Sequence, residues 1–197
     1  LIASRSGRAI RFHEENVRPM GRIATGVRGL QLDEDGDDIV VGMIAVRNPQ
    51  EETIMVVSEE GYGKRSDIED YRKTNRGGKG VKTMNITDKT GKLVGIESVT
   101  HEHDLMIINK SGIAIRLNVE DVRIMGRATQ GVKLIDLEKR NDQIGSICKV
   151  LTEAEEEAEI EEMEGQVGDD DTQVDTPETD VKEDTEDNSD EPSTFGT

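Results

Sequence analysis

Glycine recurs at fixed intervals along the first 150 residues of this 197-residue chain. A first set of glycines is followed 19 residues later by a second set, and the two sets are Gly7, Gly61 and Gly112, then Gly26, Gly80 and Gly131. A third set follows after 16, 15 and 14 residues, at Gly42, Gly95 and Gly145. Such self-similarity is typical of stacked repeat units. We therefore divide this part of the chain into three repeats, residues 1–47, 48–101 and 102–150.

Each repeat has the pattern of four short strands. In the second repeat, the apolar run 53–57 meets a polar turn that closes at Gly61, which is typical of a hairpin with glycine in a left-handed conformation. The third repeat has the same pattern, with runs 105–108 and 114–117 on either side of Gly112. Third strands are expected to begin at Val27, Val81 and Val132, and fourth strands lie within residues 39–46, 93–99 and 144–150.

Four strands in about fifty residues are the size of a propeller blade, which buries its faces only against neighbouring blades. The sequence therefore predicts an all-β, propeller-like fold of about three four-stranded blades. Three blades do not close a ring, and only Leu1, Ile2 and Ala3 precede the first turn. We therefore expect the chain to be a piece of a larger ring. Asp67 and Asn118 precede apolar residues spaced by three, which predicts a capped helical turn between the second and third strands.

Charge divides the chain into two segments. Residues 151–197 hold 20 of the 43 acidic residues and, with Lys182, one of the 25 basic residues. The net charge of −18 therefore describes this segment, and the repeats are close to neutral. Cys148 is the only cysteine, which excludes an internal disulfide and favours a reduced, cytoplasmic setting. No apolar run has the length that a membrane span needs, so we expect no membrane partner.

Basic residues occupy the same four positions in every repeat, at 4, 11, 15 and 21 residues after the first glycine. They are Arg11, Arg18, Arg22 and Arg28, then Arg65, Arg72, Arg76 and Lys82, then Arg116, Arg123, Arg127 and Lys133. Equivalent positions in stacked blades lie along one rim, so we expect a basic track whose natural ligand is a phosphate backbone. The alternative is that these charges are solvated faces or protect sheet edges.

The segment before each second glycine combines small residues with cations. It contains Gly21 and Arg22 in the first repeat, Arg76 and Lys79 in the second, and Arg127 in the third. Small residues let backbone amides approach a phosphate while the cations neutralise it, without base-reading geometry. The loops therefore predict binding that is insensitive to base sequence, although such a loop can also be only a tight turn. The spacing does not match a Walker nucleotide-binding loop.

These loops resemble the C-terminal domain of the DNA gyrase A protein. The similarity is carried by RPMGRIATGVRGL, YGKRSDIEDYRKTNRGGKGV and IMGRATQGVKLI, and it extends from about Ile2 to Val150. The hallmark box of that family, QRRGGKG, matches the segment from Arg76 to Gly80, whereas Thr74 and Asn75 depart from it. The box belongs in the first blade of the family, so we interpret this match as a related loop of a later blade.

The resemblance implies a β-pinwheel, a propeller-like ring whose blades exchange strands and whose basic edge wraps double-stranded DNA. It also implies that the rest of the gyrase A protein, together with the gyrase B protein, completes an A2B2 assembly. ATP and Mg²⁺ would serve that whole enzyme outside this chain, so no cofactor, metal or catalytic residue is expected here. Tyr62 and Tyr71 are expected to be packing or rim residues, and His101 and His103 to form a surface turn rather than a metal site. Cys148 is expected to be a small buried residue.

Two alternatives remain open at this point. One is the related C-terminal domain of the topoisomerase IV A protein, which differs in the number of blades. The other is a protein-binding β-propeller of the kelch type. In such a protein we would expect aromatic signature residues in each blade and no cations at equivalent positions of the repeats. Only 2% of the residues are aromatic and the cations occupy equivalent positions in every repeat, so the sequence disfavours this second alternative.

The acidic segment 151–197 is expected to be largely disordered, because its composition cannot bury enough surface to fold. Residues 153–164 could form a frayed helix. The segment could be only a solubilising tail. It could also compete with DNA for the basic rim, because a tethered polyanion is present at high effective concentration.

Overall fold

The computed structural model describes residues 1–34, 36–137 and 141–152. The chain divides into two compact units, Leu1–Glu157 and Ala158–Thr197, and every described residue belongs to the first. The expectations for the acidic segment, both the frayed helix and the disorder, lie outside the described residues.

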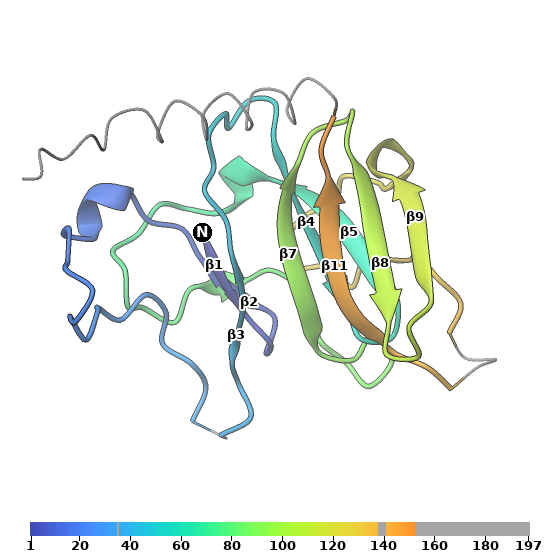
Figure 1. The fold of residues 1–197 in the computed structure, drawn as a ribbon, viewed down its shortest axis with the longest axis horizontal. Helices are drawn as coiled ribbons and strands as arrows, with labels where there is room; N and C mark the ends of the chain where they lie inside the picture. The colour runs from blue at the N-terminus through green and yellow to red at the C-terminus, as the bar shows by residue number, and fades with distance from the viewer. Residues whose placement is uncertain (35, 138–140, 153–197) are drawn as a thin grey trace, which may run out of the picture. The chain divides into compact units, whose positions relative to one another are not determined.

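The described residues form three antiparallel sheets (Figure 1). In chain order the strands are β1 (Ile2–Ser4), β2 (Arg8–Ile10), β3 (Val40–Met43), β4 (Thr53–Ser58), β5 (Tyr62–Asp67), β6 (Val81–Lys82), β7 (Leu93–Val99), β8 (Asp104–Asn109), β9 (Ala114–Asn118), β10 (Val132–Lys133) and β11 (Ile144–Val150). The strand orders are β3-β1-β2-β6, β10-β5-β4-β7 and β11-β8-β9. The all-β prediction is therefore confirmed for this part of the chain.

A hairpin opens each repeat, as the glycine pattern predicts. The pairs β1 with β2, β4 with β5 and β8 with β9 are antiparallel. Gly7, Gly61 and Gly112 have φ values of 80°, 77° and 87°, a left-handed conformation that glycine adopts without strain. At Gly61 a side chain would also collide with the next part of the fold, because its Cβ would lie 2.7 Å from the backbone oxygen of Ile135.

The repeats exchange strands. The short strand β6 belongs to the second repeat but pairs with β2 of the first, and β10 of the third repeat pairs with β5 of the second. The predicted strand at Val27 does not form within the described residues. Strands β6 and β10 each pair with the hairpin of the preceding repeat, and among the described residues no hairpin edge pairs with Val27. Within residues 1–34, 36–137 and 141–152 the third sheet has three strands, β11-β8-β9.

The sheets stack face to face around a common inner edge. Strand β7 contacts both β3 and β11, and β7 and β11 lie side by side in Figure 1. Glycine permits this approach, because a Cβ on Gly42 would lie 2.8 Å from Ile96 and one on Gly95 would lie 2.6 Å from Ile147. The exchanged strands β6 and β10 lie at the opposite, outer edge of their sheets.

Two hydrophobic cores lie between the three sheets, and β4 contributes to both. Ile54 and Val56 pack in the core with residues of the first repeat, whereas Met55 and Val57 pack in the core with residues of the third. Successive side chains of a strand point to opposite faces, so a strand that is buried between two cores can be apolar at successive positions. This explains why residues 54–57, which follow Thr53, form a continuous apolar run.

Short 3-10 turns follow each hairpin: η1 (Glu14–Asn16), η2 (Ile68–Asp70) and η3 (Val119–Asp121). The predicted helical turn is therefore confirmed. Asn118 caps η3 by accepting a hydrogen bond from the Glu120 amide, whereas the side chain of Asp67 makes no capping bond to η2. Among the described residues no helix is long and apolar enough to cross a membrane.

Candidate nucleic-acid interface

The glycine loops lie along the outer edges of the sheets. The loop of residues 72–80 leads into β6 and the loop of residues 123–131 leads into β10. Gly80 and Gly131 have φ values of 68° and 81°, and both lie close to the backbone of the preceding repeat. A Cβ would lie 2.4 Å from the Ala9 oxygen at Gly80 and 2.6 Å from the Gly63 oxygen at Gly131. The second glycine therefore joins each loop to the neighbouring sheet.

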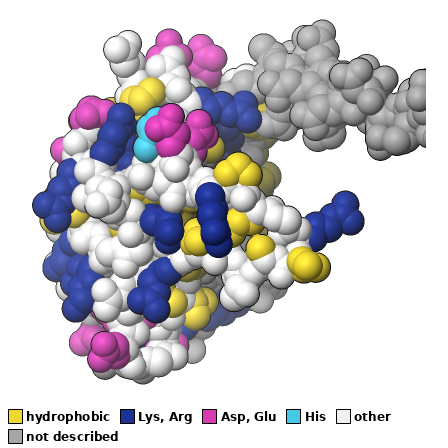
Figure 2. Space-filling view, turned by 90° about the vertical axis from the view of Figure 1, so that its left-hand side faces the viewer, with side chains coloured by type: hydrophobic (Ala, Val, Ile, Leu, Met, Phe, Trp, Pro, Cys, Tyr) yellow, Lys and Arg dark blue, Asp and Glu magenta, His cyan; other side chains and the backbone are white. Residues whose placement is uncertain are grey.

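Most of the predicted DNA-binding cations are exposed. The exposed residues are Arg18, Arg22, Arg28, Arg72, Lys79, Lys82, Arg116, Arg123 and Lys133. Figure 2 shows the side of the molecule on which the first repeat lies in Figure 1, and Lys and Arg side chains are spread across the middle of this face. Asp and Glu side chains gather nearer its top and bottom.

Three of these exposed cations already have polar partners. Arg116 forms an ion pair with Asp104 at 2.6 Å, Lys133 pairs with Asp136 at 2.9 Å, and Lys82 donates to the Asn85 side chain at 3.3 Å. The other exposed members form no ion pair with any described residue, and they are Arg18, Arg22, Arg28, Arg72, Lys79 and Arg123. These six side chains, and Lys82, whose partner Asn85 is neutral, carry the charges that a ligand could neutralise.

Arg11 and Arg65 do not lie on the rim, which corrects the expectation from the repeat pattern. Their exposed fractions are 6% and 3%. Arg11 donates to the carbonyl oxygens of Ile68 and Tyr71 at 2.9 and 3.2 Å, and Arg65 donates through Nε to the Val122 oxygen at 2.8 Å. Both acceptor sets belong to the following repeat, so these arginines hold adjacent repeats together.

Arg76 and Arg127 are half-buried and are bound to backbone. Arg76 donates to the carbonyl oxygens of Asn16 and Arg28 at 2.9 and 3.0 Å. Arg127 donates to the carbonyl oxygens of Asp70 and Lys82 at 3.0 and 2.8 Å. In each case the acceptors belong to the preceding repeat.

The structure brings the cations of neighbouring repeats together at the boundaries between them. Arg28 and Arg76 meet through the bond just described, and Arg127 meets Lys82 in the same way. The amide of Arg65 donates to the Arg123 oxygen at 3.2 Å, which places Arg123 at the second boundary. Exposed positive charge therefore recurs from one repeat boundary to the next.

Lys64 is a basic residue of this region that the repeat pattern does not reveal, because Ile10 and Ile115 occupy its position in the other repeats. Its side chain is fully buried, and its ammonium donates to the Gly126 oxygen at 2.8 Å and to the Ser66 hydroxyl at 3.1 Å. Burial lowers the pKa of Lys64 to about 8. Lys64 thus supports the third glycine loop from beneath.

Lys73 is a second cation that the pattern misses, because Pro19 and Ile124 stand at the equivalent positions. It is exposed, and its backbone forms a bridge with Arg11. The signal that could have found it is local: the run from Arg72 to Lys79 holds four cations within eight residues.

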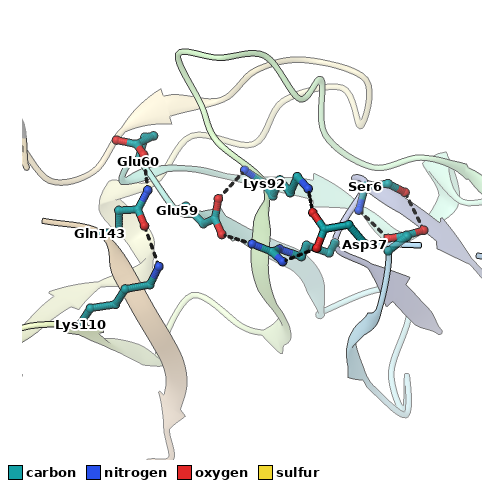
Figure 3. Close-up of polar contacts among 9 residues, drawn as sticks. Ser6, Asp37, Glu59, Glu60, Lys92, Lys110 and Gln143 are labelled. Atoms are coloured by element: carbon teal, nitrogen blue, oxygen red, sulfur yellow. Dashed lines mark hydrogen bonds and ion pairs between the residues drawn. The ribbon is translucent and has the colours of Figure 1, made fainter. Parts of the chain in front are cut away.

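A network of ion pairs and hydrogen bonds surrounds the hairpin turn of the second repeat, which holds Glu59 and Glu60. Arg5 donates to Glu59 at 2.8 Å and to Asp37 at 3.1 Å, and Lys92 also pairs with Asp37 (Figure 3). Further along, Gln143 donates to Glu60 at 2.8 Å. These bonds join all three repeats. Burial opposes ionisation of Glu59, but hydrogen bonds from Arg5 and from the Lys92 amide outweigh it and hold the pKa of Glu59 below its usual value.

Tyr62, Tyr71 and His103, considered as nucleophiles or metal ligands, are buried in the fold. Tyr71 is fully buried with its hydroxyl 2.5 Å from that of Thr83, and Tyr62 is 8% exposed. His103 is buried rather than on a surface turn, and its Nδ1 accepts from the Thr100 amide. Cys148 is exposed, contrary to expectation. No group of metal-ligating side chains occurs among the described residues.

This arrangement suits a polyanion. Cations without acidic partners, set in glycine loops, can neutralise phosphates that follow one another along the outer edge. The tyrosines are buried, so they offer no stacking platform for bases.

Residues 1–47, 52–100 and 103–145 match the sequence model of a family described as DNA gyrase C-terminal domain, beta-propeller. The chain is 48% identical over 163 residues to the DNA gyrase A protein of Staphylococcus aureus strain MRSA252, which covers 82% of this chain and 18% of that relative. It is 47% identical over 164 residues to the same protein of strain NCTC 8325, with 83% and 18% covered. The chain thus spans under a fifth of the length of these relatives.

Solved structures share the fold. The C-terminal domain of DNA topoisomerase IV superimposes with a TM-score of 0.73 at 22% identity, over 84% of this chain and 50% of that one. A DNA gyrase A C-terminal domain superimposes with a TM-score of 0.64 at 25% identity, over 76% of this chain and 50% of that one.

Proposed function

Because this chain belongs to the DNA gyrase C-terminal domain family, we propose that it binds double-stranded DNA by its phosphate backbone and wraps it, in support of ATP-dependent negative supercoiling. The observation that carries the proposal is the set of exposed cations without acidic partners in the glycine loops. Those of the second and third repeats precede β6 and β10 at the outer edge of consecutive sheets, and Arg28 lies beside the second loop, so one duplex can meet them in turn.

Binding of this kind is independent of base sequence. Arginine and lysine side chains that contact phosphates fix the position of the duplex and carry no sequence information. Their contribution is electrostatic, because each neutralised phosphate releases condensed counterions. In a propeller, successive blades are arranged around a central axis, so cations that recur at successive repeat boundaries favour a curved path.

In this proposal the chain is one part of a larger enzyme. The rest of the gyrase A protein, together with the gyrase B protein, would complete an A2B2 assembly in the cytoplasm. Cleavage of DNA, with ATP and Mg²⁺, would take place on those other parts, and the wrapped segment presented by this domain would be passed through the break.

Gyrase is favoured over topoisomerase IV by sequence. The relatives that are 47–48% identical over four-fifths of this chain are gyrase A proteins, whereas the likeness to topoisomerase IV at 22% identity reports the fold alone. A protein-binding propeller is disfavoured because exposed cations, not aromatic side chains, recur in the loops.

A salt titration tests the proposal. The chain is titrated onto a fluorescent duplex of arbitrary sequence at several salt concentrations, and log affinity should fall linearly with log salt, by about 0.9 per phosphate neutralised. Arg72→Gln and Lys79→Gln should each make the slope less steep by about that amount. Arg47→Gln removes an exposed arginine from the linker before β4 and serves as the matched control. Salt-independent binding, or a strong preference for one base sequence, would refute this function.

A test of wrapping uses closed circular DNA. The circle is relaxed by a type I topoisomerase in the presence of the chain and then deproteinised. A wrapped path leaves a shift in linking number that grows with protein concentration, whereas simple coating leaves none. An unchanged linking number at saturation would restrict the function to binding.

A further inference from the structure

The bonds made by Arg76 and Arg127 are equivalent in the repeat. Asn16 and Asp70 both stand nine residues after the first glycine of their repeats, and each is the last residue of a 3-10 turn. The other two acceptors, Arg28 and Lys82, both stand 21 residues after that glycine. The same guanidinium therefore makes the same two bonds at both boundaries, which identifies a built feature of the repeat.

A guanidinium is suited to this task because its donors form a rigid planar fork. Arg76 and Arg127 each use Nε and Nη1 for two carbonyl oxygens that come from different segments of the preceding repeat. A lysine ammonium is a point charge on a flexible stem and cannot reproduce this geometry. Two of the donors that would form a fork to a phosphate are thus already engaged.

We infer that Arg76 and Arg127 are positioning residues of the DNA-binding surface, which fix the phosphate-binding cations of the preceding repeat rather than bind phosphate themselves. The inference rests on the proposed function. It divides the cations of the loops into those that bind phosphate and those that position them. The carbonyl groups that they hold belong to Arg28 and Lys82, which are themselves exposed cations. The fork therefore acts on the backbone from which a phosphate-binding side chain extends.

Backbone bonds show what the fork stabilises at the first boundary. The amide of Gly77 donates to the Gly29 oxygen at 2.6 Å, and the amide of Gln31 donates to the Gly78 oxygen at 3.0 Å. The bond from Arg76 to the Arg28 oxygen lies directly beside this pair, because Arg76 precedes Gly77 and Arg28 precedes Gly29. Fork and backbone bonds together set the direction of one loop relative to the next, and hence the path of a duplex that lies across both.

Arg76→Lys is the decisive variant, since it keeps the charge and removes the fork. Arg47→Lys is the matched control, because Arg47 is exposed and lies outside the loops. Amide hydrogen exchange on the full chain without DNA should be about tenfold faster at Gly77 and Gln31 in Arg76→Lys, and unchanged in the control. Circular dichroism below the unfolding transition checks that both variants are folded.

DNA bending supplies the second measurement. A duplex labelled at both ends reports bending by energy transfer at saturating protein, where affinity no longer contributes. Arg76→Lys should reduce the transfer while the salt slope of binding stays that of the wild type, because the number of neutralised phosphates is the same. Arg72→Gln should do the opposite, with a slope smaller by about 0.9 and wild-type exchange at Gly77 and Gln31.

The outcomes separate the two assignments. If Arg76→Lys matches Arg47→Lys in exchange and bending, the positioning role is wrong. If Arg76→Gln lowers the slope by about 0.9 and Arg76→Lys restores it, Arg76 is a phosphate ligand and the inference is also wrong. If the wild-type chain neither binds nor bends DNA, the proposed function fails, whereas the exchange experiment still decides whether the fork holds the boundary.

Discussion

The ammonium group of Lys64 donates a 2.8 Å hydrogen bond to the backbone carbonyl of Gly126, so a buried cation of the second sheet supports the glycine loop of the third repeat. Burial lowers the pKa of Lys64 from 10.5 to about 8. Between these two values the unfolded chain binds the proton and the folded chain does not. The free energy of unfolding should therefore rise with pH across this window.

Lys64→Met tests this pH dependence. The variant lacks the titrating group, so its stability relative to the wild type should be highest at pH 8 and should decline towards pH 10.5. The Gly126 oxygen keeps its bond from Thr129 in the variant, which limits the structural cost. Urea unfolding of both proteins at pH 8 and pH 10.5 measures the difference between their free energies of unfolding. The same difference at both pH values would contradict the lowered pKa of Lys64.

The ion pair between Arg5 and Glu59 should make the first boundary sensitive to acid. Its 2.8 Å hydrogen bond contributes to the lowered pKa of Glu59, so the carboxylate stabilises the fold at neutral pH, and this contribution is lost as pH falls through the folded-state pKa. Glu59→Gln should cost about 1 kcal/mol at neutral pH and progressively less below pH 4.5. Thermal unfolding against pH tests this, with Glu51→Gln, at an exposed site in the linker, as the control.

Gly80→Ala should be far more destabilising than Gly26→Ala. Both glycines have positive φ, at 68° and 83°, so alanine costs about 1 kcal/mol of backbone strain at either position. Only at Gly80 would the new Cβ also collide with backbone, 2.4 Å from the Ala9 oxygen, whereas nothing lies within 4 Å at Gly26. We expect a further loss of about 2 kcal/mol at Gly80, since β6 must move away from β2.

Urea unfolding measures this difference in one pair of variants. If the exchanged strand matters for cooperativity, Gly80→Ala should also lower the denaturant dependence of the unfolding free energy, because less surface is exposed on unfolding. Equal losses at the two glycines would mean that the close approach to Ala9 is relieved without cost.

The hairpins and the apolar strands could be predicted because their determinants are local. A glycine at the end of a polar turn, such as Gly61, is required by the conformation of that turn alone. The short third strands could be placed in the sequence but not in a sheet. Val81 pairs with Ala9 across a repeat boundary, and the sequence of residues 79–83 does not indicate which hairpin edge is its partner. The resemblance to a strand-exchanging family supplied that information.

The roles of the cations could not be predicted from their positions within the repeat. Arg65 and Arg116 occupy the same repeat position, yet Arg65 is 3% exposed and the side chain of Arg116 is 61% exposed. The difference lies in the neighbours, because the third repeat covers Arg65, whereas no described residue of a following repeat covers Arg116. Burial of a residue at a boundary depends on the next unit, which a position within one unit does not encode.

Replacing Arg65 and Arg11 with methionine tests their structural role. Arg11 has two carbonyl acceptors and a contact to Glu69, whereas the Nη1 of Arg65 is buried with no hydrogen-bond partner among the described residues. Burial also lowers the pKa of Arg65, because its charge is poorly compensated. Arg11→Met should cost about 3 kcal/mol and Arg65→Met about 1 kcal/mol or less, since a buried cation with an idle donor is the easier one to replace by an apolar side chain. Both variants should retain the wild-type salt slope of DNA binding, with Arg72→Gln measured for comparison. A slope smaller by about 0.9 in either variant would show that the replaced arginine neutralises a phosphate.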